Sequence, residues 1–253
     1  MSYIVIKIGG STLTNLHAST IEDISKLKEQ GYQPIIVHGG GPFINKALEQ
    51  QGVAPLFEDG LRVTTDEVLS ITSQTLVGNV NPGLVSKINQ SNIQSIGMNG
   101  IDAKLFDVAP LDEKYGYVGE PKDINTSVFD KITDQFIPVI ASIGMNQATS
   151  QLYNINADTL AYKIAQALNA PLYLLSDIPG VLINKEVQST LNAERIQCFI
   201  DQELIYGGMI PKVQDAIQAI ELGCQKVVIA AGSEAHIIKK LQDGENVGTT
   251  IQQ

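Results

Sequence analysis

The sequence has few cysteines and no long apolar run. Only Cys198 and Cys224 occur among its 253 residues, and their spacing fits neither a metal site nor a close disulfide pair. No run approaches the roughly 18 apolar residues of a membrane helix, and the chain enters a strand pattern within its first residues rather than a charged leader. We therefore expect reduced thiols, no membrane partner and a cytoplasmic location.

Positive charge is also scarce. The chain carries 17 Lys and Arg against 27 Asp and Glu, a formal net charge of −10. Such a balance disfavours nucleic acid and anionic membranes as partners. Acidic metabolites remain open as ligands, provided that local lysines, arginines and backbone N–H groups receive them.

Several common catalytic patterns are missing. The chain contains neither G-x-x-x-x-G-K-[ST] nor G-x-G-x-x-G, which argues against a P-loop NTPase, a protein kinase and a dinucleotide dehydrogenase. Its three histidines form no Ser–His or Cys–His arrangement, and there is no metal-ligand cluster in the sequence. We expect His38 to bond loop backbone rather than to act in catalysis.

What the chain does have is an alternation of strand and helix patterns. Its 43% hydrophobic content and 22 glycines suit one large α/β domain, or two lobes on one sheet. The buried strands are predicted at 3–8, 35–37, 136–144 and from 171, with an antiparallel excursion over 103–119. The clearest helices are predicted at 20–30, 42–48, 77–89, 154–168 and 211–222.

Two of these strands end in glycines. Gly39, Gly40 and Gly41 follow the second strand, and Pro42 suits the first position of the next helix. Gly9 and Gly10 follow the first strand in the same way. One interpretation is a pair of tight turns. The other, which the repetition favours, is that uncovered backbone N–H groups at both strand ends face one crevice and bind an anion.

Several charged residues stand where local rules disfavour them. Lys7 interrupts a buried isoleucine strand, and Lys212 lies in the first turn of a helix, where a cation is disfavoured. Asp158 and two asparagines crowd one helix start. Arg62 lies in an apolar segment, where it meets either a ligand carboxylate or phosphate, or an internal salt bridge. Together with the glycines these residues indicate phosphoryl transfer, which needs positioning and charge neutralisation.

The residues also resemble a known family nearly from end to end. The matching stretches are Lys7-Ile-Gly-Gly10, Val37-His-Gly-Gly-Gly-Pro42, Asp59-Gly-Leu-Arg-Val-Thr64, Gly116-Tyr-Val-Gly-Glu120, Ile137-Pro-Val-Ile-Ala-Ser-Ile-Gly144, Asn154-Ile-Asn-Ala-Asp158, Leu175-Ser-Asp-Ile-Pro-Gly180 and Gly207-Gly-Met-Ile-Pro-Lys212. They are similar to the amino-acid kinase superfamily and, within it, to the N-acetyl-L-glutamate kinase family. The lysine-glycine start is shared across the superfamily, whereas Gly-Leu-Arg-Val-Thr with Asn-Ile-Asn-Ala-Asp is more specific. Asn81-Pro82 and Ala103 depart from the expected pattern.

The resemblance implies a role for each matching residue. Lys7 and Lys212 would neutralise the transferred phosphoryl group, and Asp158 would hold both ammonium groups. Gly40, Gly41, Arg62 and Asn154 would bind N-acetyl-L-glutamate, with Arg62 on its α-carboxylate. The residues implied for ATP, bound with Mg²⁺, are Gly9, Gly10, Ser176, Asp177, Gly180, Leu182, Tyr206 and Met209. The nucleophile would be the γ-carboxylate of the substrate, already ionised, so no general base is required.

The resemblance further implies an open three-layer α/β/α sandwich on one mainly parallel sheet. Residues 1–150 would form an N-terminal lobe for the acetylated amino acid, and residues 151–253 a C-terminal lobe for ATP. It also implies a homodimer, and one insensitive to arginine, because the extra N-terminal helix of arginine-inhibited hexamers is not in the sequence. The alternatives are a kinase for acetylated or carrier-linked aminoadipate, and a non-catalytic nucleotide-binding sensor on the same fold.

Overall fold

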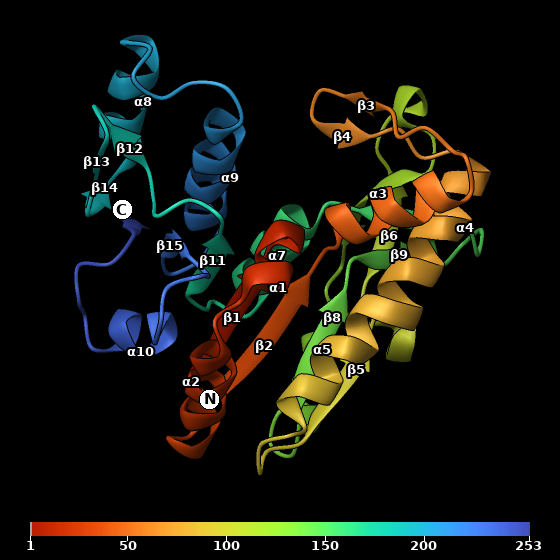
Figure 1. The fold of residues 1–253 in the computed structure, drawn as a ribbon, viewed down its shortest axis with the longest axis horizontal. Coiled ribbons are helices and arrows are strands. Elements are labelled where there is room, and N and C mark those ends of the chain that lie inside the picture. The colour runs from red at the N-terminus through yellow and green to blue at the C-terminus, as the bar shows by residue number, and fades with distance from the viewer. Residues whose placement is uncertain (1) are drawn as a thin grey trace.

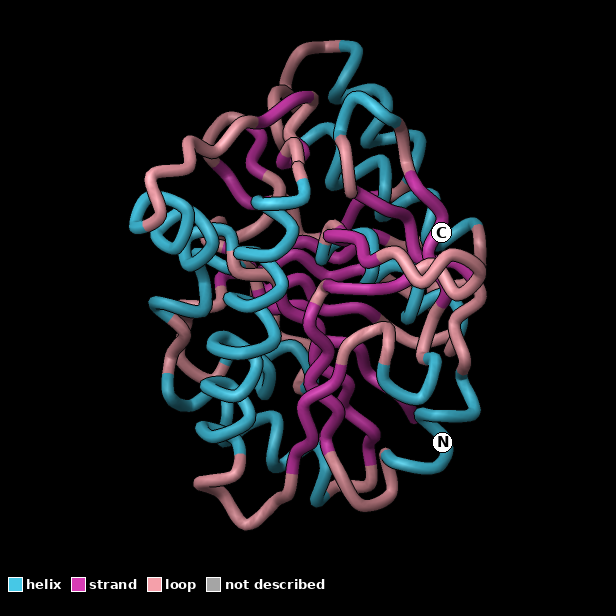
Figure 2. The backbone as a smooth tube through the Cα atoms, turned by 90° about the vertical axis from the view of Figure 1, so that its right-hand side faces the viewer, coloured by secondary structure: helices cyan, strands magenta, loops and turns pink. Residues whose placement is uncertain are grey.

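The framework of the protein is one sheet of eight strands with helices on both faces (Figures 1 and 2). The computed structural model describes residues 2–253, so Met1 lies outside it. In spatial order the strands are β14 (Thr190–Leu191), β16 (Thr249–Ile251), β15 (Val227–Ala231), β11 (Leu172–Ser176), β1 (Ser2–Ile8), β2 (Tyr32–His38), β8 (Ile137–Ala141) and β5 (Ser95–Met98). The pairs from β15 to β5 are parallel and β16 runs antiparallel to β15, which confirms the predicted mainly parallel sheet.

Alternate residues of β1 enter two different hydrophobic cores. Ile4, Ile6 and Ile8 lie in one core and Val5 in the other. The first core includes side chains of α1 (Gly10–Asn15), α2 (Ala18–Glu29), α3 (Gly41–Gln50), α4 (Asp66–Thr75), α5 (Asn81–Ile88) and α10 (Ile237–Gln242). The second includes side chains of α6 (Thr126–Ile132), α7 (Ala157–Ala167), α8 (Ala193–Asp201) and α9 (Met209–Glu221). The period-2 pattern of the strand thus produces the three predicted layers.

Smaller strands form additions to the sheet. Four of them close into a small barrel: β6 (Asp107–Pro110), β7 (Val118–Lys122), β9 (Ile143–Met145) and β10 (Leu152–Ile155). The antiparallel pairing of β6 with β7 confirms the predicted excursion. Two hairpins are β3 (Phe57–Glu58) with β4 (Leu61–Arg62), and β12 (Leu182–Ile183) with β13 (Glu186–Val187). Short 3₁₀ turns are η2 (Asp102–Lys104) and η3 (Glu113–Tyr115).

Two predicted boundaries are wrong. The run 136–144 is not one strand: β8 ends at Ala141, and β9 joins the barrel instead, pairing with β10. Apolar periodicity cannot reveal that change of partner, because both halves are buried. The helix predicted from Asn154 begins at Ala157, because Asn154 belongs to β10. Asn156 is its N-cap, and its side chain accepts bonds from the backbone of Asp158 and Thr159.

The helical stretch predicted over 77–89 contains an irregular turn. Between α4 and α5 the backbone forms a π-helical turn, η1 (Leu76–Val80), and Pro82 occupies the start of α5. The dihedral angles of Thr75, Val80 and Asn81 are all right-handed helical, so the three segments form one continuous path. A π turn within a helix shifts the faces that follow it, and such turns are frequent at functional sites. Among the described residues, no helix has the length and apolar character that crossing a membrane requires.

Candidate active site

The two glycine-rich strand ends meet at the carboxyl edge of the sheet. β1 and β2 are paired in parallel with Ile8 opposite His38, so both chains leave the sheet side by side. A Cβ atom added to Gly10 would lie only 2.6 Å from the backbone nitrogen of Gly41. This contact confirms that both loops face one crevice, as parallel sheets place their ligand sites at this edge.

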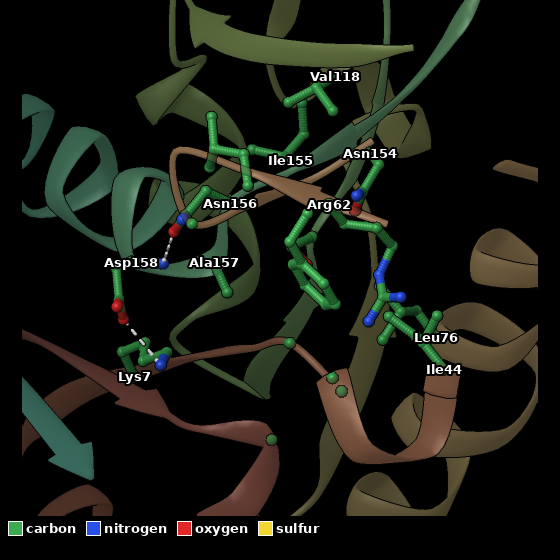
Figure 3. A pocket seen from close by; sticks show the side chains of 18 residues that line it. Lys7, Ile44, Arg62, Leu76, Val118, Asn154, Ile155, Asn156, Ala157 and Asp158 are labelled. Atoms are coloured by element: carbon green, nitrogen blue, oxygen red, sulfur yellow. Dashed lines mark hydrogen bonds and ion pairs between the residues drawn. The ribbon is translucent and has the colours of Figure 1, made fainter. Parts of the chain in front are cut away.

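A cavity of about 240 Å³ opens beside these loops. Its lining is Lys7, Gly10, Gly39, Gly40, Gly41, Ile44, Phe57, Gly60, Leu61, Arg62, Leu76, Val118, Ser142, Asn154, Ile155, Asn156, Ala157 and Asp158 (Figure 3). Seven residues to which the resemblance gave a role therefore lie together in it: Lys7, Gly10, Gly40, Gly41, Arg62, Asn154 and Asp158. They come from β1, β4, β10, α7 and the two glycine loops, which are distant in sequence.

One carboxylate at the cavity joins two lysines. Lys7 Nζ forms an ion pair with Oδ1 of Asp158 at 2.7 Å (Figure 3), and Lys212 Nζ approaches Oδ2 of the same residue at 2.9 Å. Asp158 lies in the first turn of α7, and Lys212 in the first turn of α9, outside the cavity lining. Burial alone would raise the pKa of Asp158. The combined effect of the two ammonium groups is larger and lowers the pKa to about 2. The carboxylate is thus ionised at neutral pH and holds two cations close together.

Arg62 reaches the cavity from the β3–β4 hairpin. Its Nη2 donates to Oδ1 of Asn45 on α3 at 2.6 Å, and its guanidinium lies over the ring of Phe57, 4.7 Å from the centroid. Nη1 is buried and has no hydrogen-bond partner, and burial lowers the pKa of Arg62. Among the described residues no carboxylate pairs with Arg62, so the internal salt bridge considered from the sequence is not formed. A buried guanidinium nitrogen without a partner beside a cavity is suited to an anionic ligand.

Asn154 lies on the same side of the cavity. Its Nδ2 donates to Oγ1 of Thr64 at 3.3 Å, and Thr64 Oγ1 in turn donates to the carbonyl of Arg62 at 2.8 Å. The amide of Asn154 is therefore tied to the strand that carries Arg62. Figure 3 shows both side chains on the wall opposite Lys7 and Asp158.

Apart from Gly10, the residues implied for ATP lie outside this cavity lining. Ser176 ends β11 beside β1, and its hydroxyl donates to Oδ1 of Asp177 at 3.1 Å. Gly9 donates its N–H to the carbonyl of Leu175 at 3.1 Å. The others are Gly180, Leu182, Tyr206 and Met209, of which Tyr206 is strongly exposed. Their nucleotide roles stay predictions.

Gly180 has a steric explanation that is independent of any ligand. Its φ of +151° lies in a region that side chains rarely adopt. A Cβ there would also lie 2.6 Å from Oγ1 of Thr249, and that hydroxyl accepts the N–H of Val181 at 2.8 Å. The backbone angle and the packing are therefore sufficient reasons for a glycine at this turn, whether or not a ligand binds there.

The described part of the chain offers a divalent cation no cluster of protein ligands. Over residues 2–253 no group of three or more His, Cys, Asp or Glu side chains is arranged to hold a metal ion. Magnesium that accompanies a nucleotide is held mainly by phosphate oxygens and water, so such a group is not a requirement.

Sequence reasoning missed the residues that shape the wall around Arg62. Phe57 pairs with Arg62 across the hairpin, and Asn45 reaches the guanidinium from α3. The hairpin had a local signal, since Asp59 and Gly60 both have positive φ and an Asp-Gly pair favours such a turn. Asn45 had none, because its contact joins two separate elements.

The chain was also compared with known proteins. The model of the amino acid kinase family matches residues 2–231. An acetylglutamate kinase of Staphylococcus saprophyticus is 72% identical over 99% of both chains, and one of Staphylococcus aureus is 50% identical over the same shares. The crystal structure of smu.665 from Streptococcus mutans superposes with a TM-score of 0.85 at 32% identity, covering 99% of this chain and 98% of that one.

Proposed function

The chain belongs to the amino acid kinase family, and we propose that it transfers the γ-phosphoryl group of ATP to the side-chain carboxylate of N-acetyl-L-glutamate. The observation that carries this proposal is the pairing of Lys7 and Lys212 with Asp158 beside two glycine loops. The full-length similarity to acetylglutamate kinases supports the choice of acceptor. The product is an acyl phosphate, N-acetyl-L-glutamyl 5-phosphate, an intermediate suited to arginine biosynthesis.

The chemistry follows from the charges at the cavity. A carboxylate oxygen of the acceptor attacks the γ-phosphorus, while the bond from that phosphorus to the bridging oxygen breaks and its electron pair leaves on ADP. Lys7 and Lys212 neutralise negative charge on the moving group, and Asp158 holds the two ammonium groups against their mutual repulsion. N–H groups of the glycine loops, including Gly10 and Gly41, add donors there. The acceptor is ionised at neutral pH, so no base is needed.

The acceptor would lie between Arg62 and the glycine loops. Nη1 of Arg62, which is buried and has no partner, would donate to the α-carboxylate, while Nη2 stays bonded to Asn45. Asn154, anchored by Thr64, would bond the acetylated amino group. Gly40 and Gly41 would then receive the end of the substrate that is phosphorylated.

ATP would enter from the second half of the chain, residues 151–253. Ser176 and Gly9 lie at adjacent strand ends, so nucleotide phosphates there would approach Lys7 and Lys212. Asp177, Gly180, Leu182, Tyr206 and Met209 would surround the nucleoside. Mg²⁺ bound to the phosphates would neutralise part of their charge.

The assembly and location belong to the same proposal. The family resemblance supports a homodimer that works in the cytoplasm on these two small molecules. Light scattering of the purified protein coupled to gel filtration tests the dimer: a mass of about twice the 27.3 kDa of one chain supports it and a monomer contradicts it.

The acceptor is tested by trapping the acyl phosphate with hydroxylamine. Reactions with ATP would contain N-acetyl-L-glutamate, glutamate, N-acetyl-aminoadipate or no acceptor. We expect hydroxamate chiefly with N-acetyl-L-glutamate. A preference for N-acetyl-aminoadipate would show that the longer compound is the substrate. Absence of hydroxamate with every acceptor would contradict the kinase proposal and favour the non-catalytic nucleotide-binding sensor.

A further inference from the structure

Two buried polar side chains lie behind the glycine loop. His38, the last residue of β2, is fully buried, and Asn81, the first residue of α5, is nearly so. Nδ2 of Asn81 lies 2.9 Å from Nε2 of His38 and 2.9 Å from the carbonyl oxygen of Val139. Nδ1 of His38 lies 3.0 Å from the carbonyl oxygen of Gly39. These contacts form a continuous chain from β8 to the cavity wall.

The partners fix which nitrogen of His38 carries the proton. The carbonyl of Val139 only accepts, so the Asn81 atom facing it must be the NH₂ group, which then also donates to Nε2 of His38. Nε2 is therefore the acceptor, and Nδ1 carries the proton that it donates to Gly39. Burial lowers the pKa of His38 to about 4, so the ring is neutral at pH 7.

This bond also determines the direction of an N–H group in the loop. The carbonyl of Gly39 and the N–H of Gly40 belong to one planar trans peptide, so they point in opposite directions. Because the buried imidazole holds the carbonyl, the N–H of Gly40 must face away from it. Gly39, Gly40 and Gly41 all line the cavity.

The π-helical turn η1 supports the same peptide from another side. A Cβ on Gly40 would lie 2.7 Å from Cδ2 of Leu76 and 3.3 Å from Cγ2 of Val80, the first and last residues of that turn. Asn81 follows directly. A Cβ on Gly97 would lie 2.0 Å from Oδ1 of Asn81, so glycine on β5 leaves the space that the amide occupies. The helix path is thus closely packed where it delivers Asn81 to His38.

We propose that His38 and Asn81 are positioning residues, which hold the Gly39 carbonyl in the interior and so keep the N–H of Gly40 directed at the cavity. They touch no reacting atom. Their effect on phosphoryl transfer, which rests on the proposed function, is exerted through the glycine loop.

The hydrogen-bond chain can be tested without any substrate. Nitrogen-15 NMR of the imidazoles at neutral pH reports which ring nitrogen is protonated, and the His38→Gln variant assigns the signal among the three histidines. We expect a neutral His38 with its proton on Nδ1. A proton on Nε2 would overturn the proposal, because Nδ1 would then present a lone pair to a carbonyl oxygen.

Two substitutions of His38 separate positioning from packing. In His38→Asn the side-chain amide can take the place of Nδ1 and still donate to Gly39. In His38→Gln the longer side chain places its amide where Nε2 was, facing Asn81, so the carbonyl of Gly39 loses its hydrogen-bond donor. We expect kcat of His38→Asn to stay within about threefold of the parent and kcat of His38→Gln to fall by about tenfold or more, because a donor of this kind is misdirected. Glutamine is closer to histidine in size, so a packing role predicts the reverse order, which would overturn the proposal.

Asn81→Leu supplies the partner measurement. It removes the donor to Nε2, so we expect a similar loss of kcat and little further loss when it is combined with His38→Gln. Additive losses would contradict a shared pathway. Thr133→Val is the control: it deletes a buried bond from Oγ1 to the Phe129 carbonyl on α6 and should lower the unfolding temperature without lowering kcat. If the parent shows no kinase activity, the proposed function fails, while the NMR result still decides the geometry.

Discussion

Lys7 and Lys212 meet on the two oxygens of a single carboxylate, that of Asp158, at 2.7 and 2.9 Å. One lysine comes from the central strand and the other from the first turn of α9, more than two hundred residues later. Both positions are locally unfavourable for a cation. The contact explains them together, since neither ammonium group would be held at its place without the shared acid.

The lysines should therefore act on the transition state more than on binding. We expect Lys7→Ala and Lys212→Ala to lower kcat by about 10²–10³, with much smaller changes in KM for either substrate. Steady-state kinetics with each substrate varied gives the comparison. The control is Lys131→Ala, at an exposed site on α6, which should leave kcat unchanged. If Lys212→Ala keeps most of the parent kcat, Lys212 has no role in catalysis.

The ionised carboxylate of Asp158 should make the free energy of unfolding depend on pH in the acid range. Its pKa is about 2 in the folded protein, against an ordinary value of 3.8, so the carboxylate stabilises the fold above about pH 4. That contribution should be lost as the pH falls from about 4 toward 2. Denaturant unfolding of the parent and Asp158→Asn across this window measures it. The difference in unfolding free energy between them should change over this window, and a constant difference would show that Asp158 titrates normally.

Arg62 should affect the binding of the acceptor and not that of ATP. Arg62→Lys keeps the charge but loses the planar fork that binds Asn45 and, in the proposed function, would also bind the acceptor. We expect KM for N-acetyl-L-glutamate to rise at least about tenfold while KM for ATP changes little. Arg195→Lys is matched to it, because Arg195 also lies over an aromatic ring, that of Phe199, but on α8. An unchanged acceptor KM in Arg62→Lys would place the substrate elsewhere.

The approach of the two glycine loops gives a steric prediction. Gly10→Ala would place a Cβ 2.6 Å from backbone of Gly41, so the loops must separate and activity should fall by at least about tenfold. The control is Gly83→Ala in α5, where the new Cβ would meet nothing within 4 Å apart from its chain neighbours and the helix's own backbone. That change should raise stability by about 0.5–1 kcal/mol and leave kcat unaltered. Equal activity in Gly10→Ala and Gly83→Ala would contradict the close contact.

Much of the fold could be predicted because its signals are local. Alternation in β1 assigns Ile6 and Val5 to opposite faces, and the glycines after each strand mark where chains leave the sheet. Lys7, Lys212 and Asp158 were found because each violates or exceeds a local rule. The family resemblance implied that they act together, whereas the strand order that brings them to one point is seen only in the structure.

The remaining features depend on contacts between distant segments. The end of β8 at Ala141 is set by the barrel partner of β9, and the position of Asn154 by its pairing in β10. Asn45 meets Arg62 only after α3 and the hairpin have packed. The bond from Asn81 to His38 likewise needs the π turn, which no periodicity of the sequence indicates.

The central claim is that a carboxylate oxygen of the acceptor attacks the γ-phosphorus. It is tested most directly with N-acetyl-L-glutamate carrying ¹⁸O in both oxygens of its side-chain carboxylate. The labelled substrate is incubated with the enzyme, unlabelled ATP and hydroxylamine. Hydroxylamine attacks the acyl carbon of the acyl phosphate product and releases phosphate that keeps the bridging oxygen. Mass spectrometry of that phosphate should show one ¹⁸O atom for each hydroxamate formed. Phosphate without label would mean that water, and not the carboxylate, takes the phosphoryl group, and would contradict the account.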